Sequence, residues 1–160
     1  MNRNIALTLM TAALLFFSSE ARMNAEEKEV ELPKLPSGAG KVDKDAPKTF
    51  TVTKSGLKYR VLRQGSGGKP TADNTVKVNY EGWLDGGKVF DSSYKRGEAI
   101  EFPLSGVIPG WTEGMQLVGK GGMIELEIPA KLAYGDRPPR GSGIGPGATL
   151  HFVVELLEVK

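Results

Sequence analysis

The chain has 160 residues, enough for one domain with a short attachment but not for a second large core. Its 21 lysines and arginines are balanced by 19 acidic residues, which argues against a nucleic acid as the partner. The 21 glycines and 10 prolines exclude a helical bundle and indicate short strands joined by turns, and the lack of cysteine excludes disulfides and thiolate chemistry.

Residues 1–21 have the features of a secretory signal peptide. Arg3 supplies a positive charge, and the uncharged, mostly apolar run 5–17 is shorter than the roughly 20 residues that a membrane-spanning helix needs. We expect cleavage after Ala21, with Ala25 as the second choice. The sequence therefore predicts an exported protein, periplasmic or secreted, with no stable membrane span after cleavage. An uncleaved anchor or a buried helix is the alternative.

Residues 22–49 are expected to form a flexible linker. The segment mixes basic and acidic residues, contains three prolines and has few large aliphatic side chains. Such a composition buries too little apolar surface to offset the entropy of ordering the chain. The segment also lacks the long heptad pattern of a dimerisation helix, so a monomer is predicted.

Residues 50–160 alternate between apolar and polar side chains with period two, which is typical of half-buried strands. Such runs lie at 57–61, 76–80, 100–102, 124–128 and 149–159. Residues 108–118 break the rhythm, because their apolar side chains recur at spacings of three and four, as in a short helix. The pattern predicts an α+β domain in which one short helix covers a twisted antiparallel sheet.

The sequence offers few groups for covalent or metal chemistry. His151 is the single histidine, and alone it completes neither a usual metal site nor a catalytic triad. The glycine-rich stretch 141–147 runs into a strand rather than opening a helix, so it is a poor phosphate loop. No metal and no cofactor are expected. Aromatic side chains are instead spread one per predicted element, at Tyr80, Phe90, Phe102, Trp111, Tyr134 and Phe152.

Five stretches around these aromatics resemble, in order, the signature motifs of FKBP-type peptidyl-prolyl cis/trans isomerases. They are VNYEGWL (78–84), VFDSS (89–93), VIPGWTEG (107–114), LAYG (132–135) and ATLHF (148–152). The resemblance covers roughly residues 51–160 and is greatest to bacterial exported members similar to macrophage infectivity potentiators. It implies a five- or six-stranded antiparallel sheet wrapped around a short helix.

The resemblance also implies a pocket that binds proline. It assigns catalytic roles to Tyr80, Phe90, Asp91, Trp111, Tyr134 and Phe152, and substrate contacts to Phe102, Val107, Ile108 and Ile144. The implied activity is rotation about X-Pro bonds, the implied substrates are proline-containing polypeptides, and the implied inhibitors are macrolides of the rapamycin type.

Two other functions are compatible with the same residues. A chaperone or binding module would hold proline-containing segments in the same pocket without useful catalysis. A structural or adhesive β-domain would instead scatter the aromatics through the core, with no shared cavity.

Overall fold

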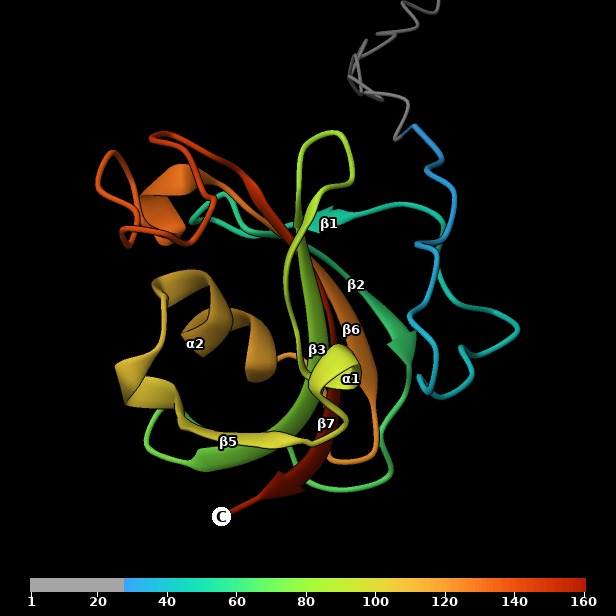
Figure 1. Ribbon diagram of the computed structural model, residues 1–160. Helices are drawn as coiled ribbons and strands as arrows, with labels where there is room; N and C mark the ends of the chain where they lie inside the picture. The colour runs from blue at the N-terminus through green and yellow to red at the C-terminus, as the bar shows by residue number, and fades with distance from the viewer. Residues whose placement is uncertain (1–27) are drawn as a thin grey trace, which may run out of the picture.

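The computed structural model describes residues 28–160. The predicted signal peptide, both candidate cleavage sites and the start of the predicted linker lie outside the described residues. Figure 1 shows a curved sheet with the longer helix on its concave side. The strands are β1 (Thr51–Val52), β2 (Lys58–Arg63), β3 (Thr75–Leu84), β4 (Val89–Ser92), β5 (Ile100–Pro103), β6 (Met123–Ile128) and β7 (Leu150–Val159), and the α-helices are α1 (Ser93–Arg96) and α2 (Pro109–Met115).

The predicted fold class, an antiparallel sheet wrapped around a short helix, is confirmed. The sheet has seven strands rather than five or six, and the two that the period-two runs did not reveal are β1 and β4. Strand β1 has too few residues for a period-two pattern, and β4 has two adjacent apolar residues followed by two polar ones. Two short 3-10 turns, Leu104–Gly106 and Ala130–Leu132, complete the elements. Among the residues described, no helix is both long and apolar enough to cross a bilayer.

Strand β3 organises the sheet. The order is β1-β2-β6-β7-β3-β4, and all neighbouring strands run antiparallel. One edge of β3 pairs with β7 along its whole length, whereas the other edge pairs first with β5 and then with β4. Two short strands thus share one long neighbour end to end, and α1 lies in the connection between them (Figure 1).

Helix α2 packs closely against the concave face of the sheet. Trp111, Met115 and the inward residues of β3, β6 and β7 belong to one buried cluster. Two glycines of α2 allow the close approach, because a methyl group at Gly110 would lie 2.4 Å from Ile128 and one at Gly114 would lie 2.7 Å from Leu126. The predicted helix ends earlier than expected, at Met115, although Val118 is still buried.

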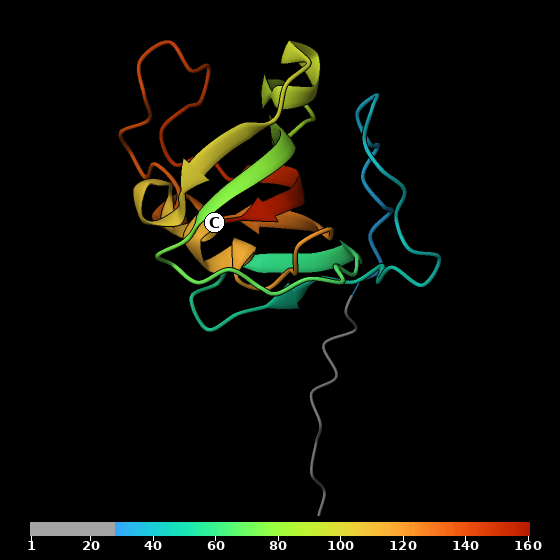
Figure 2. The ribbon, with the colours of Figure 1, turned by 90° about the horizontal axis from the view of Figure 1, so that it is seen from below.

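Residues 28–49, here called the outer segment, lie on the face of the sheet opposite α2 in both views (Figures 1 and 2). Leu35 and Val42 pack against a small buried cluster on that face. The backbone N–H of Asp43 donates to the carbonyl of Leu62 at 2.8 Å. The mobility expected for residues 22–49 stays a prediction. The structure shows contacts that join the outer segment to the sheet.

The strongest of these contacts belong to Arg60. Its guanidinium donates to the carbonyls of Val30, Glu31 and Lys48 at 2.8, 2.7 and 3.1 Å. Its Nε donates to the Glu125 carboxylate at 2.6 Å, and the two side chains are 1% and 7% exposed. Glu125 does lie on the outward face of its strand, as its alternation with apolar neighbours suggests, but the outer segment covers that face.

We expect Arg60→Ala to lower the free energy of unfolding by about 3–5 kcal/mol, because it leaves the buried Glu125 carboxylate without its partner. Lys58→Ala on the same strand is the control, since the Lys58–Glu127 pair is 46% and 26% exposed. That substitution should change stability by less than about 1 kcal/mol. Urea unfolding monitored by circular dichroism measures both, and equal effects would contradict the structural role of Arg60.

Candidate functional site

One cavity, of about 500 Å³, opens between α2 and the strands that flank it. Every predicted site residue except Ile144 lines it. The lining residues are Tyr80, Phe90, Asp91, Phe102, Gly106, Val107, Ile108, Trp111, Tyr134 and Phe152. They come from β3, β4, β5, β7, the start of α2 and the loops beside them, so segments far apart in the sequence build one hollow.

The base of the cavity is a group of rings in edge-to-face contact. The Trp111 ring lies 5.3 Å from that of Tyr80 and 5.4 Å from that of Phe152, at interplanar angles of 89° and 86°. Phe102 closes the third side at 5.7 Å. Such packing fixes each ring against its neighbours, and Trp111 is only 4% exposed. The cavity is therefore a preformed apolar surface.

Phe90 and Phe152 form one wall, with ring centroids 5.5 Å apart. Their approach depends on Gly82, which stands opposite Phe152 in the sheet. A methyl group at this position would lie 2.7 Å from both rings. A side chain at Gly82 would therefore displace the wall.

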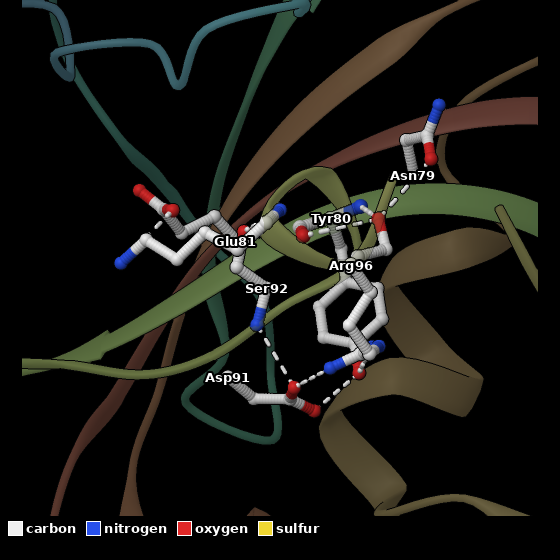
Figure 3. Close-up of polar contacts among 8 residues, drawn as sticks. Asn79, Tyr80, Glu81, Asp91, Ser92 and Arg96 are labelled. Carbon is white, nitrogen blue, oxygen red and sulfur yellow. Dashed lines mark hydrogen bonds and ion pairs between the residues drawn. The ribbon is translucent and has the colours of Figure 1, made fainter. Parts of the chain in front are cut away.

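The polar edge of the cavity centres on Asp91. Its carboxylate accepts hydrogen bonds from the Tyr80 hydroxyl, the Arg96 guanidinium and the backbone N–H of Ser92 (Figure 3). Arg96 also donates to the Tyr80 oxygen at 3.1 Å. The carboxylate is thus held in one orientation beside an apolar surface.

Arg96 and Ser93 also belong to this site, although neither was predicted from the sequence. Ser93 is fully buried, and its hydroxyl accepts from the Tyr80 N–H at 2.8 Å. The sequence does hold a signal, because a carboxylate beside an apolar pocket is stabilised by a nearby cation. Arg96 follows Asp91 by five residues, across a turn that begins with two serines.

These contacts change the ionisation of both partners. Burial would raise the pKa of Asp91, but the hydrogen bonds from Tyr80 and Arg96 outweigh it and lower this pKa below its usual value. Burial, and then the hydrogen bond to Asp91, raise the pKa of Tyr80 to about 12. Near neutral pH the carboxyl is therefore ionised and the phenol is a hydrogen-bond donor.

The remaining predicted residues lie at the mouth of the cavity or beyond it. Tyr134 is 38% exposed at the rim, on the loop after β6. Ile144 does not line the cavity, because it packs at the edge of the core, where the Ser142 hydroxyl accepts its N–H at 3.2 Å. His151 lies on the outer face, where its ring stacks on Trp83 and bonds to Asp85 at 2.7 Å.

The arrangement suits non-covalent binding of a compact apolar group next to a fixed carboxylate. The polar side-chain groups among its lining residues are the Tyr80 and Tyr134 hydroxyls, the Asp91 carboxylate and the Trp111 indole N–H. Across residues 28–160, no cluster of three or more metal-ligating side chains occurs.

Comparison with known proteins gives one family. The family described as FKBP-type peptidyl-prolyl cis-trans isomerase matches residues 67–157. FkpA of Escherichia coli strain K12 is 51% identical over 113 residues, which are 71% of this chain and 41% of the relative. Mip of Coxiella burnetii is 46% identical over 118 residues, 74% of this chain and 50% of the relative.

A solved structure agrees with these sequence matches. The crystal structure of Escherichia coli FkpA superposes with a TM-score of 0.66 at 52% identity, covering 69% of this chain and 51% of that one. The predicted resemblance is thereby confirmed. The chain spans half or less of the length of these relatives.

Tyrosine titration tests the polar edge of the cavity. At about pH 11 a phenol with the usual pKa of about 10 is mostly ionised, whereas Tyr80 should still be protonated. We therefore expect the wild type and Tyr80→Phe to show the same tyrosinate absorbance up to that pH. A difference spectrum with a midpoint near pH 10 would show instead that Tyr80 is not buried against Asp91.

Proposed function

The chain belongs to the FKBP-type peptidyl-prolyl cis-trans isomerase family, and on that premise we propose that it accelerates rotation about X-Pro bonds in other polypeptides. The observation that carries this proposal is the aromatic cavity with Trp111 at its base. Its apolar lining suits a prolyl ring and its volume leaves room for the residues beside that ring, and we assign its carboxylate and tyrosine hydroxyls to orienting the peptide.

The chemistry needs no bond to be broken. Amide resonance holds the X-Pro bond planar, with a barrier of about 20 kcal/mol, so the uncatalysed rotation takes tens to hundreds of seconds. Water favours the charge-separated planar form, whereas the twisted form has a more ketone-like carbonyl. An apolar cavity removes the solvation that favours the planar form, and so stabilises the twisted one relative to it.

Each part of the cavity has a role in this proposal. Trp111, Phe90 and Phe152 bind the prolyl ring and exclude water. The Tyr134 hydroxyl donates to a peptide carbonyl, whereas the Asp91 carboxylate, which only accepts hydrogen bonds, orients the peptide through its N–H groups, with no proton transferred. Each tenfold gain in rate requires about 1.4 kcal/mol of preferential transition-state binding, which shape and desolvation can supply.

We also propose that the chain is exported, to the periplasm or the exterior, and acts there on folding proteins. The support is the sequence of residues 1–21, which the mass of the mature protein would test. A monomer is proposed because one copy of the chain supplies every cavity residue. Sedimentation analysis would test it.

A chaperone or binding module is the second candidate, because the cavity would also hold a proline-containing segment without turning it. The two differ in one respect, since only the enzyme must bind the twisted form more tightly than the planar one.

We expect Trp111→Leu to lower kcat/KM for a short X-Pro peptide by at least about tenfold, because it removes the base of the cavity while keeping an apolar side chain in the core. Trp83→Leu is the matched control, since Trp83 lies on the outer face. A protease-coupled assay or NMR exchange measures the rates. A wild-type rate equal to the uncatalysed one, with the peptide bound, would favour the binding module.

A macrolide of the rapamycin type should inhibit the wild type competitively, because it would occupy the same apolar cavity. Its dissociation constant should rise at least about tenfold in Trp111→Leu and stay unchanged in Trp83→Leu. Titration of intrinsic fluorescence or calorimetry measures it. Equal affinity in wild type and Trp111→Leu would place the macrolide elsewhere.

A further inference from the structure

A buried carboxylate on the outer face joins three parts of the chain. Glu155 of β7 is 6% exposed. Its Oε1 accepts from the Tyr94 hydroxyl at 2.5 Å and from the Gly40 N–H at 3.0 Å, and its Oε2 accepts from Arg63 at 2.7 Å. The sheet, the outer segment and helix α1 therefore meet at one side chain.

The outer segment fits this junction tightly. A methyl group at Gly40 would lie 2.2 Å from the Arg63 guanidinium and 2.8 Å from the Glu155 carboxylate. Arg63 also donates to the carbonyl of Lys41 at 3.0 Å. The Tyr94 side chain comes near Gly38 in the preceding turn. The contact is specific in shape as well as in charge.

Helix α1 cannot fix its own position. It has four residues, too few for a helix that is stable by itself. Ser93 fastens its start to the backbone of Tyr80. Tyr94 fastens its outward side to Glu155, and Arg96, two residues further, reaches Asp91 and the Tyr80 hydroxyl.

We propose that Tyr94 and Glu155 are positioning residues of the isomerase site, which hold α1 from the outer face of the sheet so that Arg96 keeps Asp91 and Tyr80 in place. The inference rests on the proposed function, because it assigns these residues an effect on that reaction. Neither side chain lines the cavity. Their effect passes through Arg96.

The ionisation states of the pair favour this hydrogen bond near neutral pH. Burial would raise the pKa of Glu155, but the donors Tyr94, Arg63 and the Gly40 N–H outweigh it and lower this pKa. Burial, and then the neighbouring Glu155, raise the pKa of Tyr94 above its usual value. Tyr94 therefore remains a donor and Glu155 an ionised acceptor near neutral pH.

Removal of one hydroxyl tests the proposal. Tyr94→Phe should lower kcat/KM about threefold to tenfold, mainly through kcat, because Asp91 loses its fixed orientation in the transition state. Glu155→Gln keeps the size of the side chain but is a weaker acceptor, and should act in the same direction. Lys95→Ala is the control on the same helix, since this side chain is 66% exposed, and it should leave kcat/KM unchanged.

A double-mutant cycle separates positioning from general destabilisation. If Tyr94 acts through Arg96, Tyr94→Phe should change kcat/KM by less than about twofold in an Arg96→Ala background. A loss that persists undiminished in that background would overturn the proposal. So would unchanged activity of Tyr94→Phe and Glu155→Gln beside an active wild type.

The order of the Arg96 side chain, measured by NMR relaxation of its Nε–H group, gives a readout that needs no catalysis. It should fall in Tyr94→Phe and stay unchanged in Lys95→Ala. Equal order in the wild type and Tyr94→Phe overturns the inference whatever the assay gives. If the wild type is inactive but the Arg96 side chain is less ordered in Tyr94→Phe than in the wild type, the proposed function is wrong. The inference that Tyr94 positions Arg96 would then still hold.

Discussion

The structure depends on the packing of one indole ring between a short helix and a curved sheet. Trp111 contacts Tyr80, Phe102 and Phe152, which belong to three different strands, and its own helix lies against β6 through two glycines. The sheet must curve to reach all of these rings, and the ring edges that remain uncovered form the cavity. Stability and the site thus share the same side chains, because the base of the cavity is also the centre of the core.

Much of this could be predicted from the sequence, because its signals are local. Period-two alternation marks the long strands, and the spacing of Ile108, Trp111 and Met115 marks the helix, although not its last turn. The aromatics of the cavity stand in motifs of the family, so their convergence followed from the resemblance. The alternation of apolar and polar residues alone could have placed these aromatics on the inner face of the sheet, but it could not have shown that they line one cavity.

The features that were missed depend on contacts between distant segments. Arg96 is one of many exposed-looking cations in the sequence, and only the folded connection between β4 and β5 brings it to Asp91. The composition of residues 28–49 resembles that of a linker. Three backbone carbonyls of this segment nevertheless accept hydrogen bonds from the Arg60 guanidinium. Ile144 was placed over the site by the resemblance alone; it is not among the residues that line the cavity, and it packs at the edge of the core cluster.

Strand β7 follows all the others in the chain, yet it lies in the interior of the sheet, between β6 and β3. Until it is available, β1, β2 and β6 have no hydrogen-bonded link to β3, β4 and β5. A chain that emerges from a ribosome or a translocation channel with its N-terminus first therefore cannot close this sheet while residues 150–159 are still inside. The topology therefore delays completion of the sheet until the last strand has emerged.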